Sequence, residues 1–152
     1  MRRTVLPLGL AALLALAACS GDTPYVVVGG GGIIFNYRVA EATAGIVAEV
    51  ARPLPEGGTV EAQFEDPAGG PPIVETKPVT PDRRRFSFST PPLTGIKADT
   101  DYRVVVRVLD AAGTEVQRVE TSLHSDLDQS ILPEAPLTVG PGYAPNPAAA
   151  TE

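Results

Sequence analysis

The chain has 152 residues, and its 12 Lys and Arg are outnumbered by 18 Asp and Glu, giving a formal net charge of −6. Phosphate binding depends on clustered Lys and Arg, so this acidic balance argues against nucleic acid as a partner. The sequence contains no Trp and four Phe, so any core must consist mostly of Val, Ile and Leu.

The first 18 residues have the pattern of a secretory signal. Arg2 and Arg3 precede an uncharged, mostly apolar run of about 15 residues, too short to cross a hydrocarbon core of roughly 30 Å as a helix. A basic start, a short apolar segment and small residues at its end are typical of a cleaved signal peptide. We therefore expect residues 1–18 to be removed.

The end of this segment, Leu16-Ala17-Ala18-Cys19, resembles the bacterial lipobox, a leucine and two small residues before an invariant cysteine. The resemblance implies that the thiol of Cys19 receives a diacylglyceryl group, that cleavage occurs before Cys19, and that the new amino group is acylated. One acyl chain binds membranes reversibly, whereas two or three make attachment effectively permanent. The alternative is an ordinary secretory signal in which Cys19, the only cysteine, is incidental.

Lipidation of Cys19 would hold a mature protein without a transmembrane helix on a membrane surface. Ser20, in place of aspartate, favours the periplasm-facing outer membrane; in a bacterium with one membrane, the motif indicates the outer face of the plasma membrane. Loss of residues 1–18 leaves 10 basic against 18 acidic side chains, a net charge of about −8. With Cys19 acylated, no thiol remains for a disulfide.

The four glycines at 29–32 lie between two apolar runs, as in VVVGGGGIIF. The dinucleotide fingerprint G-x-G-x-x-G fails, because its third glycine would fall on Ile34 or Phe35. We interpret residues 20–32 as a flexible tether, within a lipidated segment at 19–43. An alternative stays open, in which YVVV and IIFNYRV are two strands of a hairpin around the glycines, or an added edge strand.

From Ala44 to about Gly140 the chain repeats an apolar alternating run followed by a turn rich in Pro, Gly and acid. The runs are GIVAEV, TVEAQFE, IVETKPV, RFSFST, DYRVVVRVLD, TEVQRVETS and PLTVG. Side chains alternate across a strand, so Val60, Ala62 and Phe64 should share one face. Likewise Tyr102, Val104, Val106 and Val108 should lie opposite Arg103 and Arg107.

The gaps between these runs carry turn residues, and Gly113 in the loop LDAAGTE occupies a position that needs positive φ. About seven strands with proline between them predict an all-β fold, a single antiparallel β-sandwich over residues 44–140. The segment 141–152 is rich in proline and poor in large apolar residues, and we expect a disordered tail.

The search for catalytic residues yields little. Ser122, His124 and Asp126 have the residue types of a hydrolase triad, but at this spacing a strand would point all three the same way. Triads come from separate elements that converge, so we interpret His124, the single histidine, as a surface residue. We expect neither an enzyme nor a cofactor, and no small-molecule substrate is indicated.

A weak divalent metal site is the alternative use of His124. Asp126 and Asp128 follow it, and Asp66 or Asp99 could add a carboxylate from elsewhere. Zinc sites usually take several His or Cys ligands, so this interpretation is the weaker one, and no calcium-loop spacing occurs.

Arg83, Arg84 and Arg85 form the only basic cluster. The plain interpretation is a solvated turn before the run RFSFST. The functional alternative is contact with anionic lipid head groups or with an acidic segment of a partner.

The mature domain resembles the YbaY/YscW-type family of small bacterial lipoproteins. The resemblance rests on the order and spacing of GIVAEVARPLPEGGTVEAQFED, IVETKPV, RRRFSFST, IKADTDYRVVVRVLDAAGTEV and ILPEAPLTVGP. Two segments depart from the family pattern: the added IIFNYRV before the first family strand, and VETSLHSDLD after the hairpin. Some members are pilotins, which carry a secretin subunit to the outer membrane through their own lipid.

The resemblance implies a membrane-anchored periplasmic binding or assembly-accessory module, whose partner would be a secretin or another outer-membrane protein. Such a module would take up an extended peptide at a sheet edge or in a groove between sheets. The alternative is a structural or stress-related envelope lipoprotein without a dedicated ligand.

Overall fold

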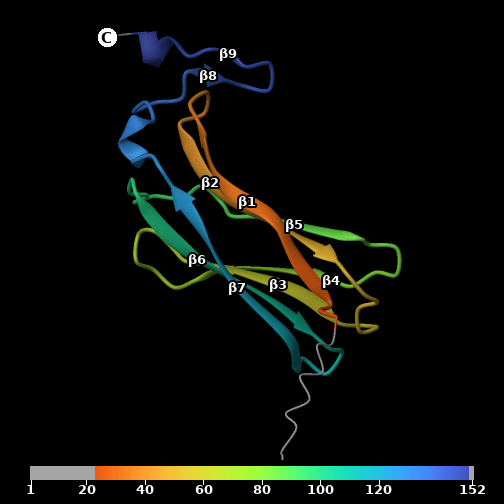
Figure 1. Cartoon of the computed structure of the whole chain (residues 1–152). Helices are drawn as coiled ribbons and strands as arrows, with labels where there is room; N and C mark the ends of the chain where they lie inside the picture. The colour runs from red at the N-terminus through yellow and green to blue at the C-terminus, as the bar shows by residue number, and fades with distance from the viewer. Residues whose placement is uncertain (1–22, 151–152) are drawn as a thin grey trace, which may run out of the picture.

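The computed structural model describes residues 23–150, which form an all-β protein with seven main strands (Figure 1). The main strands are β1 (Val26–Asn36), β2 (Glu41–Val50), β3 (Thr59–Phe64), β4 (Ile73–Pro78), β5 (Arg85–Ser89), β6 (Thr100–Leu109) and β7 (Glu115–Ser125). A 3₁₀ turn η1 (Gln129–Ile131), a small hairpin of β8 (Thr138–Val139) and β9 (Ala144–Pro145), and η2 (Pro147–Ala150) follow. Within the described part of the chain, no helix is long and apolar enough to span a bilayer.

The main strands form two antiparallel sheets that pack as a sandwich. One sheet has the order β1-β2-β5 and the other β4-β3-β6-β7. The hairpin of β8 and β9 is a third, separate sheet at the far end of the β1–β2 turn (Figure 1). The predicted all-β fold is therefore confirmed.

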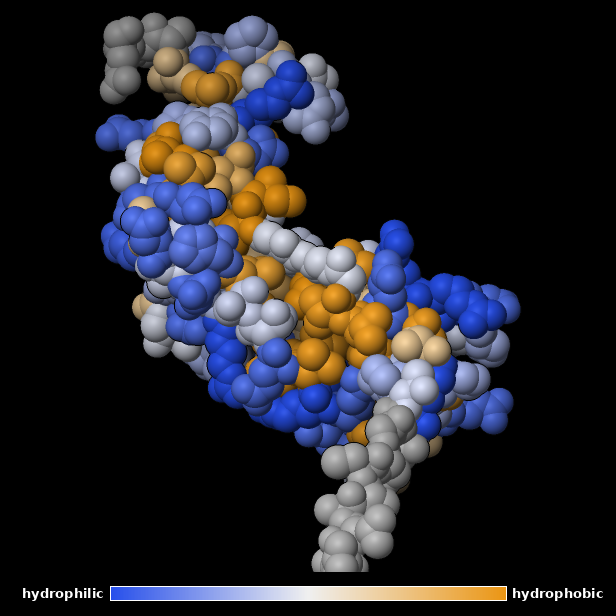
Figure 2. Space-filling model, in the orientation of Figure 1, coloured by the Kyte–Doolittle hydropathy of each residue, from blue (hydrophilic) through white to orange (hydrophobic). Residues whose placement is uncertain are grey.

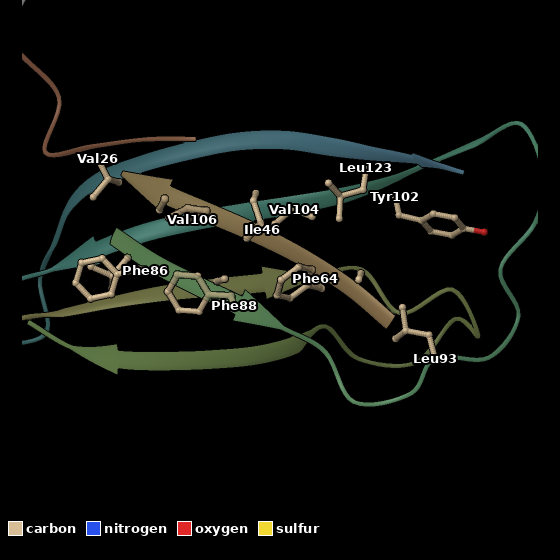
Figure 3. Close-up of a cluster of buried hydrophobic side chains, with 14 of the residues drawn as sticks. Val26, Ile46, Phe64, Phe86, Phe88, Leu93, Tyr102, Val104, Val106 and Leu123 are labelled. Carbon is tan, nitrogen blue, oxygen red and sulfur yellow. The ribbon is translucent and has the colours of Figure 1, made fainter. Parts of the chain in front are cut away.

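The alternation in the sequence determines which face of each strand is buried. Val60, Ala62 and Phe64 of β3 are buried, while the residues between them are more exposed. In β6, Tyr102, Val104, Val106 and Val108 point into the core as predicted. Figure 3 shows Phe86, Phe88 and Ile46 from one sheet meeting Phe64, Val104 and Val106 from the other.

Small side chains on β2 bring the sheets together. Ala42, Ala44 and Ala48 are buried on the core face of the strand, within the same cluster as the phenylalanines and valines of the core. Protein cores are closely packed, so we expect larger side chains at these positions to be poorly tolerated. The predicted turn at Gly113 is also confirmed, because its φ is +81° and Asp110 N–H donates to the carbonyl oxygen of Thr114 at 2.9 Å.

The tether interpretation is wrong from Val26 onward. Residues 26–36 form one continuous strand paired with β2, interrupted only by a bulge between Val28 and Gly30. The folded domain therefore begins at 26 rather than 44, and the alternative of an added edge strand is correct. Residues 1–18, Cys19 and the first part of the tether lie outside the described residues.

The expected disordered tail is also wrong up to residue 150. Residues 138–145 form the β8–β9 hairpin, and η2 follows it. The run PLTVG was expected to add a strand to the sandwich, but only Thr138 and Val139 are extended, and they pair with β9. Local turn formation after Gly140, whose φ is +71°, brings the chain back on itself instead.

Candidate functional site

His124 lies on an exposed surface, as the sequence indicated, near Ser122 and Asp126, which were considered with it and rejected as a triad. His124 Nδ1 lies 3.0 Å from the Asp101 carboxylate on the neighbouring strand, and its Nε2 lies 3.5 Å from Asp126. Ser122 is exposed on the same strand, and no hydrogen bond within residues 23–150 joins it to His124. A nucleophile without a hydrogen-bonded base lacks the arrangement that acyl transfer requires.

The carboxylates considered for a metal site are held by local structure instead. Asp66 accepts hydrogen bonds from the backbone of Ala68 and Gly70 in its own turn. Asp128 caps η1 by accepting from Ser130 N–H at 3.0 Å, and it pairs with Lys97. In the described part of the chain, no three His, Cys, Asp or Glu side chains are grouped so that they could hold a metal ion.

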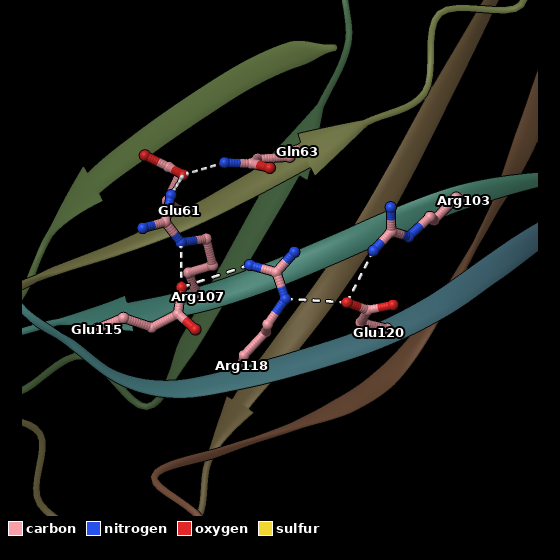
Figure 4. A network of polar contacts seen from close by, with 7 residues as sticks. All are labelled: Glu61, Gln63, Arg103, Arg107, Glu115, Arg118 and Glu120. Atoms are coloured by element: carbon pink, nitrogen blue, oxygen red, sulfur yellow. Dashed lines mark hydrogen bonds and ion pairs between the residues drawn. The ribbon is translucent and has the colours of Figure 1, made fainter.

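The outer face of the four-stranded sheet carries a network of ion pairs (Figure 4). Arg107 bridges Glu61 at 3.0 Å and Glu115 at 2.6 Å. Arg118 continues the network, contacting Glu115 at 3.4 Å and Glu120 at 2.9 Å. The period-2 pattern puts these side chains opposite the core, so the network follows directly from the alternation of β3, β6 and β7.

Glu120, like Glu115, has two arginine partners in this network. Hydrogen bonds from Arg118 and then from Arg103, which lies 2.8 Å away, lower the pKa of Glu120 below its ordinary value. The same bond to Glu120 raises the pKa of Arg118. Each charge is therefore stabilised by its neighbour, and little uncompensated charge remains for a ligand.

A shallow pocket of about 220 Å³ lies beside the network. Its lining includes Phe64, Glu65, Asp66, Arg103 and Arg118. Arg103 and Arg118 are already paired with Glu120, and Glu65 accepts the Arg103 backbone N–H at 2.9 Å. The pocket therefore offers few free polar groups to fix the orientation of a small molecule.

The edge formed by β4 and β5 is closed by side chains. Lys77 on β4 donates to the carbonyl oxygen of Ser87 on β5, and Glu75 accepts from Ser89 N–H at 2.8 Å. Pro78 at the end of β4 has no N–H to offer. Charged side chains and proline are common means of protecting a sheet edge, so this side of the sandwich is unsuited to a further strand.

The opposite side, where β1 and β7 run alongside each other, is protected much less. On the side away from β1, β2 forms backbone hydrogen bonds through Ala42, Ala44 and Val50. Their partners are Leu93 in the loop after β5, and Thr90 and Arg84, which flank β5. Because hydrogen-bonding directions alternate in antiparallel pairs, the β1 residues opposite these positions direct their N–H and C=O groups outward. By register Val26, Ile33 and Phe35 lie opposite these three β2 positions. Gly31 and Val28 lie opposite Ile46 and Ala48, which belong to the same alternating set of β2 residues, so they point outward as well.

One side chain clamps the start of this edge. Gln117 of β7 accepts from Val26 N–H at 2.9 Å and donates to the Val26 carbonyl oxygen at 2.7 Å. Beyond that clamp, within the described residues, no side chain caps the outward backbone groups of β1 from Gly31 to Phe35. We define residues 31–35 as the free β1 edge.

The glycines of β1 make this edge unusual. A Cβ at Gly31 would lie 2.6 Å from the Gly45 carbonyl oxygen and 2.9 Å from Cδ2 of Leu123, so only glycine lets β1 lie this close to β2 and β7. Glycine within a strand often marks close approach of another backbone. Ile34 is 63% exposed next to these glycines, and Figure 2 shows apolar surface along the middle of the face that β1 crosses.

No protein-family model matches the chain, and no curated protein sequence matches it. Among solved structures, a calcium-binding mutant of Bacteroides uniformis beta-glucuronidase 2 is similar over 66% of this chain at 15% identity, with a TM-score of 0.46. OgpA from Akkermansia muciniphila is similar over 69% at 16% identity and a TM-score of 0.40. This chain spans 14% and 28% of their respective lengths. These identities and TM-scores are too low to support any statement about the function of this chain.

Of the sequence-predicted site residues, His124 and Asp126 are brought together, whereas Asp66 and Asp128 are held in separate turns. Sequence reasoning did not identify the free β1 edge as a candidate site. The β-branched and aromatic residues on both sides of the glycines indicated a strand. Whether one side of that strand is an edge depends on which other strands lie next to it, and the sequence does not show this.

Proposed function

We propose that this protein is a lipid-anchored periplasmic lipoprotein, of the YbaY/YscW type that its domain resembles, and that it acts as a binding or assembly-accessory module of the outer membrane. The lipobox pattern ending at Cys19 supports the anchor. The binding role is supported by one structural observation, the free β1 edge. We infer a non-catalytic role, and the partner class is a secretin or another outer-membrane protein.

The mode of binding follows from the chemistry of the edge. Unpaired backbone N–H and C=O groups can pair with an extended peptide, as in strand addition. The outward groups of Gly31, Ile33 and Phe35 supply this pairing, and the exposed side chain of Ile34 supplies apolar contact. The ligand in this proposal is therefore an extended, partly apolar segment of an outer-membrane protein.

The anchor and its partner can be tested together by a pull-down from detergent-solubilised envelopes with the acylated, tagged protein. Cys19→Ala serves as the anchor control. We expect near-stoichiometric recovery of a secretin or other assembly component with the native chain, and release of the Cys19→Ala protein from the membrane. If Cys19→Ala stays in the membrane, the anchor proposal is wrong.

The site is tested by Ile33→Pro, which removes an outward N–H without removing a β1–β2 hydrogen bond. Thr76→Pro is the matched control, since the Thr76 N–H points outward from the other side of the sandwich by the same alternation. Ile34→Lys adds a charge at an exposed position and leaves the core intact. We expect Ile33→Pro and Ile34→Lys to lose the partner and Thr76→Pro to retain it. Recovery of the lipoprotein alone in every case would favour the structural envelope role.

A further inference from the structure

The basic side chains of the domain divide into paired and unpaired groups. Of the 12 Lys and Arg in the chain, Arg2 and Arg3 precede the described residues, which leaves ten. Six of these ten form ion pairs: Lys77, Arg85, Lys97, Arg103, Arg107 and Arg118. Within residues 23–150, no ion pair involves the other four: Arg38, Arg52, Arg83 and Arg84.

Three of these four arginines lie at one end of the sandwich, where β1 begins. The carbonyl oxygen of Tyr25 accepts from Ala51 N–H at 2.9 Å, and that of Arg84 accepts from Val50 N–H at 2.9 Å. The start of β1, the end of β2 and the start of β5 are therefore adjacent, and two strand spacings separate Tyr25 from Arg84 by about 10 Å. Arg38 is at the opposite end, in the β1–β2 turn (Figure 1).

Aromatic rings orient two of these arginines. The Arg52 guanidinium lies 3.7 Å over the ring of Tyr25, and that of Arg83 lies 5.2 Å from the centre of the Phe86 ring. Stacking of this kind leaves the in-plane N–H donors free to bind oxygen. The Nε of Arg52 is buried and has no hydrogen-bond partner among the described residues, and the side chain as a whole is partly exposed.

A pocket of about 340 Å³ opens beside these arginines. Pro53, Leu54 and Val79 form part of its apolar wall, and Arg83 and Arg84 lie on its lining with one acid, Glu56. An apolar wall beside guanidinium groups fits a phospholipid at the level of the headgroup, because guanidinium binds phosphate oxygens in a bidentate fashion. The chain as a whole is acidic, with a formal net charge of −6, so a pocket lined by two arginines and one acid differs in charge from the rest of the surface.

The segment that carries Cys19 joins the sandwich at this end, because it leads directly into Tyr25 and β1. Cys19 is six residues before Tyr25, and an extended segment of that length spans at most about 21 Å. If Cys19 is acylated, as the proposed function requires, the end of the sandwich that carries Arg52, Arg83 and Arg84 is held within that distance of the bilayer. The basic end and the anchored end coincide.

We propose that Arg52, Arg83 and Arg84 form a docking surface for the phosphate groups of anionic phospholipids, and that this surface seats the sandwich on the bilayer. β1 then runs away from the membrane, and its free edge projects into the periplasm. This inference rests on the lipid anchor of the proposed function and adds an orientation that the anchor alone does not provide.

The test uses the acylated mature chain in vesicles of phosphatidylcholine alone and of phosphatidylcholine mixed with phosphatidylglycerol. The rate at which phenylglyoxal modifies each arginine is measured by mass spectrometry. We expect modification of Arg52, Arg83 and Arg84 to be slowed about fivefold or more by phosphatidylglycerol at low salt, as expected for basic groups at an anionic surface. High salt should restore the rates, because it screens exposed charges. Arg38 is the internal control, with the same rate in both vesicles.

Equal modification of the three arginines in both vesicles would overturn this inference. The same digest reports the mass of the peptide that begins at Cys19. A peptide without lipid would overturn the anchor, whereas a lipidated peptide with unprotected arginines would overturn the docking surface alone. The pair Arg83→Gln/Arg84→Gln should also abolish the protection of Arg52 by phosphatidylglycerol, while Arg38→Gln should leave it unchanged.

Discussion

At the scale of single residues, Thr90 shows how a polar group can be required inside this core. Its side chain is only 6% exposed, and its hydroxyl accepts the Ala44 backbone N–H at 3.0 Å, just beyond the end of β5. Thr90→Val keeps the shape but leaves that buried N–H without a partner, at a cost of about 1–3 kcal/mol. Urea unfolding measures the change. Thr90→Ser retains the hydroxyl and should lose much less stability than Thr90→Val.

Glu120 provides a prediction about pH. Because its folded pKa lies below the ordinary value of 4.5, its ion pairs stabilise the fold above that pH and are lost as the pH falls through the folded pKa. Glu120→Gln should therefore lower the melting temperature at neutral pH and reduce its decline in acid. Glu41→Gln is the control, since Glu41 forms no ion pair with any described residue. Parallel pH profiles for the native chain and Glu120→Gln would contradict the prediction.

At the scale of elements, the strand boundaries show what the sequence could predict. The alternation in β3 and β6 is strong enough that the core-facing residues of both were predicted correctly, although Val105, on the opposite face of β6, is also buried. The turn between β6 and β7, with Gly113 at positive φ, was predicted as well. These features depend on periods of two residues and on local turn chemistry, which a single sequence contains.

From the sequence, β1 was only the alternative to a flexible tether, because its stability is not local. Glycine lowers strand preference and suggests a flexible linker, yet Gly31 is required by the closeness of Gly45 and Leu123. Those neighbours lie 14 and 92 positions away in the sequence, so the local pattern carries no trace of them. The candidate site could not be predicted for the same reason. The free β1 edge exists because β1 pairs with β2 on one side and, among the described residues, with no strand on the other, and the local sequence does not encode that arrangement.

The Gln117 clamp leads to a prediction about β1. Gln117→Leu removes both side-chain hydrogen bonds to Val26, so the start of β1 should open more readily. We expect the Val26 amide to exchange its hydrogen about tenfold faster, corresponding to roughly the net contribution of one to two hydrogen bonds. Hydrogen exchange followed by NMR measures this rate. Gln63→Leu is the matched control, since the Gln63 amide donates to Glu61 and, among residues 23–150, forms no hydrogen bond with β1; it should leave Val26 unchanged.

At the scale of the whole molecule, the two ends of the sandwich differ in chemistry. The end where β1 begins carries Arg52, Arg83 and Arg84, which form no ion pair with any described residue. The opposite end carries the β8–β9 hairpin, which contacts the β1–β2 turn through Thr138 and Tyr143. Leu137, Val139 and Tyr143 are exposed there. The charged side chains on the outer face of the four-stranded sheet are largely paired with one another. The groups that could contact a membrane or a partner therefore lie at the two ends of the sandwich and along the free β1 edge.

The C-terminal hairpin should contribute little to the stability of the sandwich. It is attached through Thr138, which donates its N–H and hydroxyl to the Arg38 carbonyl oxygen, and through Arg38 over the Tyr143 ring. None of residues 136–149 is buried. Ending the chain after Glu134 should therefore cost less than about 1 kcal/mol, the usual range for loss of exposed contacts.

Ending the chain after Asp126 provides the contrast, because it also removes Gln129. That residue donates to the Leu93 carbonyl oxygen at 2.6 Å, accepts from Ile96 N–H at 3.1 Å, and donates its own N–H to the Ile96 carbonyl at 3.0 Å. Loss of these three bonds should cost about 2–4 kcal/mol and loosen the segment that carries the buried Leu93 and Ile96. Thermal unfolding of both truncated chains measures the difference. Similar losses in the two chains would mean that the hairpin, and not Gln129, holds this end of the sandwich together.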